Sequence, residues 1–276
     1  YSSAASDVYK RQLVPYIDSY WEFKGNPDYG MRIHILPDGC TDFIFTLGEV
    51  ANAVEEGSLI MQPYRSYFVG PMTKYSELVT YTESIHMFGV RFLPCGLSCF
   101  TNLPLHEFVN SRVSTNEMKA VFDDTFIEKL GEQKHVTDRI RVVEEYLLAY
   151  LARHYQPADS HVAMAVNMIN HSKGKRSVRS LMDDVCLCQR HFERKFKHYT
   201  GFTPKEYSRI VKFKNAVELL RTTTSANLLT TAVDAGYYDL AHFSKEIKSM
   251  SGNTPASFLS LTVPEETTLT YIEPQR

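Results

Sequence analysis

Several patterns that define large functional classes are missing from the sequence. No apolar run approaches the length that spans a bilayer, and no charged segment followed by an apolar one marks a secretion leader. Neither Cys95-x3-Cys99 nor Cys186-x-Cys188 has the second pair of Cys or His that a zinc finger needs. With Cys40, these five cysteines fit a reducing cytosol better than a disulfide scaffold. We therefore expect a soluble, cytoplasmic protein that holds no metal or cofactor and contacts no membrane.

Catalytic motifs are missing as well. There is no H-x-H pair followed by a carboxylate, no nucleophile elbow and no glycine-rich phosphate loop. The side chains from which a metal or nucleophile site could be built are His34, Asp38, Cys40, Asp42, His86 and Arg91. The two histidines lie in strand-like segments, and the two aspartates flank a glycine as turn residues do. We predict that the protein is not an enzyme.

Charge is distributed unevenly along the chain, although the formal net charge is only −2. Residues 160–262 carry 15 Lys and Arg against 8 Asp and Glu, whereas residues 1–159 carry 14 against 21. A basic half of this kind is either an ordinary solvated surface or the electrostatic footprint of a domain that binds nucleic acid.

The basic half contains an internal repeat, which favours the second interpretation. HFERKFKHYTGFTPKEY at 191–207 returns in looser form as HFSKEIKSMSGNTPASF at 242–258, at a constant offset of 51 residues. In each copy apolar residues recur at helical spacing, with polar and basic residues on the other side. The residues that we expect in the core are Phe192, Phe196, Phe243 and Ile247.

Each copy predicts a helix, a stop and a further helix. The first helix spans about Gln189 to Tyr199 and ends at Gly201. Thr203-Pro204 then begins another helix, because Thr caps a helix well and Pro is tolerated in its first turn. In the second copy, Asp239 is the expected N-cap of a helix at about 240–250.

Short helical segments at 178–185 and 228–235 precede the two copies. Helix, tight turn and a second helix with a cationic outer face make up the helix-turn-helix arrangement, whose second helix enters the major groove of DNA. The second motif contains Ala232, Gly236-Tyr237, Asp239, His242-Phe243, Lys245, Lys248 and Gly252-Asn253-Thr254-Pro255. With this signature, residues 163–261 resemble the two-motif DNA-binding domain of AraC/XylS-type transcription regulators of bacteria.

The first motif departs from the family pattern. Where the family usually has Leu-Ala, a turn glycine and a capping serine, this chain has Leu181-Met182, Cys186 and Cys188. In the second motif Thr231 replaces a branched aliphatic residue. A cysteine at a turn that prefers glycine costs stability. We therefore expect the second motif to follow the docking of the family more closely than the first.

The resemblance implies sequence-specific binding to double-stranded DNA, with the two second helices in successive major grooves. The long helix at 204–221 would space them by about 34 Å, roughly one turn of DNA. Carried over by position, the expected base readers of the first motif are Arg190 and Arg194. The reading positions of the second motif hold Leu240, Ala241 and Lys245. The residues expected at phosphates are Gln189, Lys197, Ser244 and Lys248.

Residues 13 to about 93 have the composition of short strands, because β-branched and aromatic runs alternate with Gly, Pro, Asn and Asp. The expected strands are 20–23, 32–36, 42–46, 67–69, 77–81 and 86–92. This spacing predicts a small barrel or a double-sheet roll, and the segments 37–42 and 89–94 resemble the cupin-like sensor domains of the same regulators. The expected fold class is α+β: a mainly β, cupin-like barrel or roll with trailing helices, then an all-α domain of two helix-turn-helix motifs joined by a long helix.

After Pro94 the pattern becomes helical. The expected helices are 95–101, 104–108, 115–130, 138–155 and 161–171. The helix at 138–155 has one apolar stripe, formed by Ile140, Val143, Leu147, Leu148 and Leu151. This stripe either packs on its own domain or forms a homodimer, since related regulators often pair through helices placed there.

The chain therefore divides into four segments. Residues 1–12 contain DVYKRQ, which is similar to a translated sequencing adaptor, and we interpret them as a scar and exclude them from the fold. Residues 13–157 form the sensor and oligomerisation domain, and 161–262 the DNA-binding domain. The tail at 263–276 is expected to be disordered.

The resemblance also implies partners beyond DNA. They are an unknown small-molecule effector at the N-terminal domain and RNA polymerase, for an activator or a repressor. The alternative function is a cupin-type metabolite-binding protein or enzyme with an appended helical domain. A further alternative is a regulator that binds DNA only together with a second protein.

Overall fold

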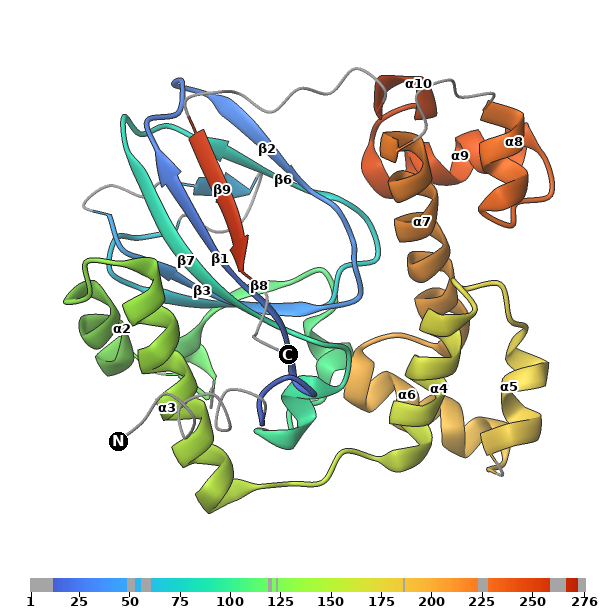
Figure 1. The fold of residues 1–276 in the computed structure, drawn as a ribbon, viewed down its shortest axis with the longest axis horizontal. Coiled ribbons are helices and arrows are strands. Elements are labelled where there is room, and N and C mark those ends of the chain that lie inside the picture. The colour runs from blue at the N-terminus through green and yellow to red at the C-terminus, as the bar shows by residue number, and fades with distance from the viewer. Residues whose placement is uncertain are drawn as a thin grey trace.

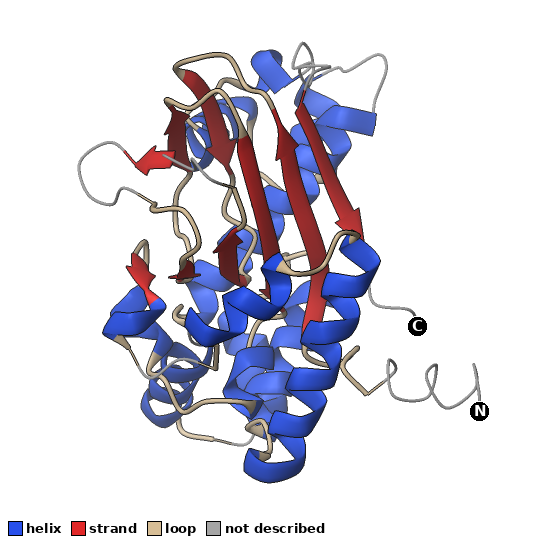
Figure 2. Ribbon diagram, turned by 90° about the vertical axis from the view of Figure 1, so that its left-hand side faces the viewer, coloured by secondary structure: helices blue, strands red, loops and turns tan. Residues whose placement is uncertain are grey.

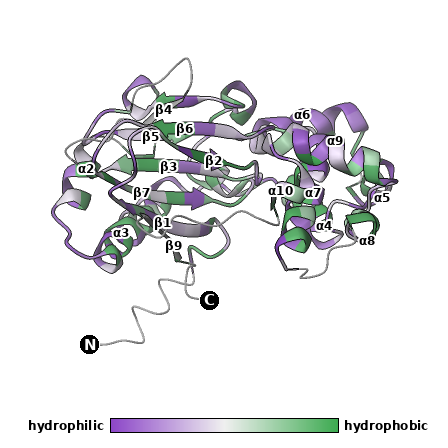
Figure 3. Cartoon of the chain, turned by 90° about the horizontal axis from the view of Figure 1, so that it is seen from above, coloured by the Kyte–Doolittle hydropathy of each residue, from purple (hydrophilic) through white to green (hydrophobic). Residues whose placement is uncertain are grey.

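The computed structural model describes residues 12–48, 53–55, 61–118, 121–122, 124–185, 187–222, 228–258 and 267–272. Within them, a β-rich N-terminal domain is followed by a helical C-terminal domain, and the two lie side by side (Figure 1). Seen from above, they remain distinct bodies that touch along one side (Figure 3). The predicted α+β class is confirmed.

Two antiparallel sheets build the N-terminal domain. The larger has the strand order β8 (Arg112–Ser114), β5 (Ser66–Val69), β3 (Thr41–Thr46), β7 (Ile85–Phe92), β1 (Ile17–Gly25) and β9 (Thr267–Ile272). The smaller has the order β2 (Met31–Ile35), β6 (Ser76–Thr80) and β4 (Ala53–Glu55). Figure 2 shows the long strands side by side as one layer. The two sheets form a roll and do not close into a barrel.

Alternation along the strands assigns side chains to two separate cores. Phe43 and Phe45 of β3 face a core that the larger sheet shares with the neighbouring helices, whereas Ile44 faces the smaller sheet. Val143 and Leu147 of α3 (Val136–His154) belong to the first of these cores. The apolar stripe predicted at 138–155 therefore packs on its own domain.

The other helices of this domain are short. They are η1 (Gly96–Cys99), η2 (Leu105–Phe108), η3 (Thr115–Glu117) and α2 (Asp124–Gly131). The single helix expected at 115–130 is wrong, because only its second half forms α2. Thr115 is instead buried against β5, where its Oγ1 donates to the Ser66 carbonyl at 3.3 Å. This contact holds the chain beside the sheet before a regular helix begins.

The disorder expected for the tail is also wrong, at least for residues 267–272. They form β9, which pairs antiparallel with β1 from Thr267 opposite Gly25 to Ile272 opposite Tyr20. β1 would otherwise be the edge of the larger sheet, with one row of backbone groups unpaired. Pairing satisfies those groups and joins the end of the chain to the N-terminal domain.

Every helix predicted for the C-terminal half is present, with ends shifted by at most two residues. They are α4 (Ser160–His171), α5 (Val178–Val185), α6 (Gln189–Thr200), α7 (Pro204–Thr222), α8 (Leu228–Asp234), α9 (Leu240–Ser251) and α10 (Pro255–Phe258). Their apolar faces share one core. Cys186, the unusual turn residue of the first motif, lies outside the described residues.

Candidate nucleic-acid interface

The two copies of the repeat form α6 and α9, and each buries the stripe expected from its sequence. Phe192 and Phe196 of α6 and Phe243 and Ile247 of α9 are fully buried, and all four belong to the same core. Burial of these side chains fixes which face of each helix remains available to a partner.

The ends of the two helices are alike, but their beginnings differ. Gly201 (φ 82°) and Gly252 (φ 74°) end them in the left-handed conformation that favours glycine. At the start of α9, Asp239 Oδ1 accepts a hydrogen bond from His242 N at 2.7 Å, which confirms the predicted N-cap. At the start of α6, Cys188 makes no side-chain cap hydrogen bond.

The helix between the motifs, α7, begins with a capping box. Thr203 N donates to Glu206 Oε2 at 2.7 Å, and Glu206 N donates to Thr203 Oγ1 at 3.2 Å. The 19 residues of α7 span about 28 Å. α6 and α9 lie near opposite ends of α7 (Figure 1), so the distance between them is set by a continuous helix.

The residues predicted to bind DNA lie on α6 and α9, away from the core. The exposed ones are Gln189, Arg190, Arg194, Lys197, Leu240, Ala241, Lys245 and Lys248, while Ser244 is half-buried. Gln189 Nε2 also donates to Glu193 Oε1 at 2.9 Å, one turn along the same face. Each motif thus gathers its own predicted residues on one helix face, and α7 keeps the two groups apart.

The N-terminal domain and the linker contact α6 on a different flank. His198 Nε2 lies 3.1 Å from Asn102 Oδ1, and Lys195 Nζ donates to Asp159 Oδ2 at 2.6 Å. Burial, together with the neighbouring His106, lowers the pKa of His198. Because these contacts leave the predicted DNA-binding residues exposed, the docked domain does not cover them.

A cavity of about 440 Å³ lies between the two motifs. Its positively charged lining residues are Lys175, Arg176, Lys205, Arg209 and Lys212, and we name it the basic cavity. No sequence pattern predicted this cavity, because its residues come from separate segments and form no local pattern. The net positive charge of 160–262 was the only sequence signal that pointed to it.

A second cavity, of about 90 Å³, lies between the two sheets of the roll. Most of its lining is apolar, with side chains from six strands that include Trp21, Ile33, Ile44 and Leu78. Its charged lining residues are Asp42, Arg91 and Arg112. We name it the roll cavity. An apolar chamber with a few converging polar groups is the usual form of a small-molecule site.

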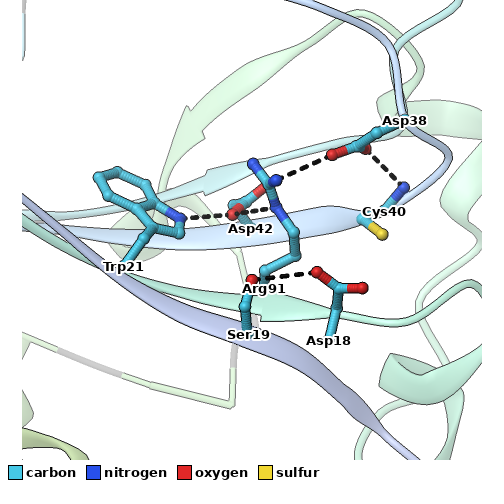
Figure 4. A network of polar contacts seen from close by, with 7 residues as sticks. All are labelled: Asp18, Ser19, Trp21, Asp38, Cys40, Asp42 and Arg91. Carbon is cyan, nitrogen blue, oxygen red and sulfur yellow. Dashed lines mark hydrogen bonds and ion pairs between the residues drawn. The ribbon is translucent and has the colours of Figure 1, made fainter. Parts of the chain in front are cut away.

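Asp42 is the centre of a polar network at the wall of the roll cavity (Figure 4). Its Oδ1 accepts hydrogen bonds from Trp21 Nε1 at 2.8 Å and from Arg91 Nε at 3.1 Å. Arg91 also pairs with Asp38 at 3.0 Å, and Asp38 in turn accepts from Cys40 N at 2.9 Å. Burial raises the pKa of Asp42, and the charge of Arg91 opposes that shift.

The turn that carries Asp38 touches the C-terminal domain. Gly39 has φ 86°, and a Cβ at this position would lie 2.7 Å from Cε2 of Tyr207 in α7. Tyr207 is buried, and its hydroxyl donates to Asn170 Oδ1 at 2.8 Å. A continuous set of contacts therefore leads from the roll cavity to the core of the DNA-binding domain.

The histidines considered for a metal or nucleophile site have ordinary strand partners. His34 Nε2 lies 2.7 Å from Glu77 Oε1, and His86 Nε2 lies 3.0 Å from Glu22 Oε1. Among the described residues, no three His, Cys, Asp or Glu side chains are grouped as a metal site would require. Within the same residues, none of the helices has the length and apolar character needed to cross a membrane.

Two parts of the chain match known families. Residues 181–260 match the family described as "Helix-turn-helix domain", and residues 10–114 match the one described as "Domain of unknown function (DUF6597)". A search of curated proteins found no match.

Solved structures of ToxT from Vibrio cholerae resemble the whole fold. One has a TM-score of 0.53 at 10% identity and covers 88% of this chain and 98% of ToxT. Another, with a bound unsaturated fatty acid, has a TM-score of 0.51 at 12% identity, covering 87% and 95%. At such identities the likeness concerns the fold alone, and it extends over both domains. The helix-turn-helix match identifies the chain as a DNA-binding transcription regulator whose C-terminal domain is of the AraC type, and the likeness to ToxT adds only a shared two-domain fold.

Proposed function

We propose that the chain reads a specific duplex DNA site by placing α6 and α9 in successive major grooves. The observation that carries the proposal is the repetition of one helix-turn-helix unit at the two ends of α7. Both second helices bury the same stripe, end in the same glycine conformation and leave their cationic faces exposed. A spacing of about one DNA turn is the geometry that two such units need to bind one face of the duplex.

The exposed side chains of α6 and α9 would recognise bases by different interactions. Arg190 and Arg194 of α6 are exposed, and a guanidinium donates two hydrogen bonds to a guanine edge. Leu240 and Ala241 of α9 cannot donate hydrogen bonds from their side chains, so they would contact thymine methyl groups beside Lys245. The phosphate contacts that fix the register would come from Gln189, Lys197, Ser244 and Lys248.

Selection from random duplex DNA by the full chain, followed by affinity measurements against salt concentration, tests this proposal. We expect a site with two boxes about one helical turn apart and a salt slope that reports several phosphate contacts. Binding without sequence preference would contradict base reading. A complete lack of binding, restored only by a second protein, would favour the regulator that needs a partner.

We further propose that a small effector binds in the roll cavity. The cavity is much smaller than the roughly 300–1,000 Å³ of drug-sized ligand pockets. A compact, mostly apolar molecule with one polar group beside Asp42 and Arg91 therefore fits better than a long acyl chain such as the fatty acid of ToxT. Its polar group would act on the network that leads through Asp38 and Gly39 to Tyr207.

Trp21 is the only tryptophan of the chain and lines the roll cavity, so its fluorescence can report occupancy. A panel of compact aromatic acids, alcohols and amides should contain a molecule that changes this fluorescence and also changes DNA affinity. Ile44→Phe, which fills the cavity, should abolish both changes while DNA binding without effector persists. An effector response that survives in Ile44→Phe would contradict this location.

The remaining predicted partners concern assembly. Because the apolar stripe of α3 is used within its own domain, a homodimer through 138–155 would use the outer face, where Arg141 and Glu145 are exposed. Sedimentation of the full chain, compared with an Arg141→Glu variant, measures this. Contact with RNA polymerase and the lack of catalysis remain predictions, and turnover by the fragment 13–157 would revive the enzyme alternative.

A further inference from the structure

The basic cavity is assembled from three segments that meet between the two motifs. Residues 174–178 lead into α5, the first half of α7 supplies one wall, and residues at the start of α9 close the other side. Five Lys and Arg residues line it, and Glu246 is the only carboxylate in the lining. The local charge is therefore strongly positive.

Some of this positive charge is compensated within the protein and some is not. Arg209 is paired with Glu246, and Arg176 with Asp184. Lys175 Nζ instead donates to the carbonyl of Asp234 at 2.7 Å, and Lys212 Nζ to that of Gly236 at 3.3 Å. A carbonyl fixes the position of an ammonium without neutralising it, and each ammonium has three donors.

The lining of the basic cavity also includes Tyr237, whose hydroxyl has no hydrogen-bond partner among the described residues. Its side chain is only 5% exposed. Lys212 Nζ lies 5.6 Å from the centroid of its ring. A buried hydroxyl left without a partner destabilises a protein, so such groups are normally satisfied by solvent or ligand.

The end of a helix contributes to the same wall. Val178, the first residue of α5, lines the basic cavity together with Ser177. Ser177 Oγ accepts from Ser180 N at 3.1 Å and so caps this end. The amides of a first helical turn and the positive end of the helix dipole favour an anion at this place.

The basic cavity opens on the side of α7 away from the N-terminal domain. Tyr207 of α7 contacts Gly39 of that domain, whereas Arg209 and Lys212 line the cavity. Two and five residues correspond to rotations of about 200° and 140° around a helix. The docked N-terminal domain therefore leaves the basic cavity open.

We propose that the basic cavity binds a phosphate group, with Lys175 and Lys212 as its charged donors and the Tyr237 hydroxyl as a neutral one. Phosphate combines negative charge with several acceptor oxygens, which matches donors converging from three segments. Two sources supply this group: the DNA backbone between the two major grooves, or free phosphate and its esters. The first source rests on the proposed function, and the second does not.

Two measurements on the full chain test the phosphate site. Calorimetric titration with inorganic phosphate, in a buffer without other oxyanions, tests the free ligand. Binding to a random duplex, followed against salt concentration, tests the DNA backbone. The variants are Lys175→Ala, Lys212→Ala and Tyr237→Phe, and the matched control is Lys214→Ala, an exposed lysine of α7 outside the cavity lining.

If free phosphate is the ligand, the wild-type chain binds it saturably and Tyr237→Phe weakens that binding about tenfold, as loss of a hydrogen bond to a charged group should. If the backbone is the ligand, inorganic phosphate does not bind, but each lysine variant lowers the salt slope for DNA by about 1 while Lys214→Ala does not. In both cases Tyr237→Phe folds with an unchanged or higher melting temperature.

The proposal is overturned if the three cavity variants behave as the Lys214→Ala control and the wild type in both measurements, while the wild type binds DNA normally. It is also overturned if Tyr237→Phe is clearly destabilised, because the hydroxyl then has a structural partner. A wild-type chain that binds neither phosphate nor any DNA would overturn the phosphate site and the proposed function together. Saturable phosphate binding without DNA binding would support the site and contradict the function alone.

Discussion

The two helix-turn-helix motifs share one backbone plan but differ in their surroundings. α6 exposes two arginines and contacts the linker and the N-terminal domain through Lys195 and His198. α9 exposes Leu240 and Ala241 in the corresponding region and has a carboxylate N-cap that α6 lacks. Both motifs contact the N-terminal domain, since Tyr75 N donates to the Met250 carbonyl of α9 at 2.9 Å. They differ in that the first exposes two arginines, whereas the second is better capped and has fewer donors.

This difference indicates a division of labour within the repeat. Specificity for bases would depend mainly on α6, whereas a change in the N-terminal domain would reach both helices, through His198 of α6 and Met250 of α9. α9 would supply affinity and hold the register. Changes in the two motifs test this division, from the largest expected effect to the smallest.

Truncating the core should damage both motifs equally. Phe196→Ala and Phe243→Ala each remove a fully buried ring from one shared core, and each should cost about 3–5 kcal/mol of unfolding free energy. Urea unfolding of the full chain measures this. If either variant lost less than about 1 kcal/mol, the two motifs would not depend on a common core.

Removing a reading arginine should separate specific from general affinity. Arg194→Ala should cost about 1–3 kcal/mol on the selected site and relax one base position, whereas Lys248→Ala should weaken all sequences alike. Anisotropy titrations with the selected duplex and a random duplex measure both effects. Equal losses for Arg194→Ala on the two duplexes would contradict its role as a base reader.

Changing the N-cap residue should have opposite effects on the stability of the chain in the two motifs. Asp239→Ala loses the hydrogen bond to His242 N and should cost about 1 kcal/mol, while Cys188→Asp should gain about 0.5–1 kcal/mol because Cys188 has the extended backbone of an N-cap. Urea unfolding again measures both. A destabilised Cys188→Asp variant would show that a neighbouring contact governs this end of α6.

Acid should weaken the contact between α6 and the N-terminal domain. The pKa of His198 is lowered in the folded chain from its ordinary value of 6.5, chiefly by burial, so the unfolded chain takes up the proton more readily. Stability from this group is complete above its ordinary pKa and declines as the pH falls below it. The difference in melting temperature between pH 8 and pH 5.5 should be smaller in His198→Gln than in the wild type. An equal difference would exclude His198 as the group responsible.

The helices of the C-terminal domain could be predicted from the sequence because short-range signals determine them. The ends of α6 and α9 follow from glycines and caps, and Phe192, Phe196, Phe243 and Ile247 follow from helical periodicity, because these signals act within a few residues. The central strands of the roll were predictable for the same reason. Arg190 and Arg194 could be named as reading candidates because the resemblance to AraC/XylS-type regulators carries the reading positions over to them.

Features built from distant segments could not be predicted in this way. Residues 115–118 lie beside β5 because the Thr115 hydroxyl donates a hydrogen bond to the Ser66 carbonyl. β9 forms because one edge of β1 would otherwise have unpaired backbone groups. The network from Trp21 through Asp42, Arg91 and Asp38 joins three strands and a turn. None of these partners is near in sequence, so no periodic pattern records them.

The sequence by itself therefore determined a duplicated DNA-reading unit, its helix ends and its buried stripe, because caps, glycines and hydrophobic period are local causes. Only the tertiary structure decided that the turn at Gly39 of the N-terminal domain meets α7 at Tyr207, that residues 267–272 pair with β1, and that Lys175, Lys212 and Tyr237 line one basic cavity. These three contacts join segments that are distant in sequence, so they form only when the separate elements pack against one another.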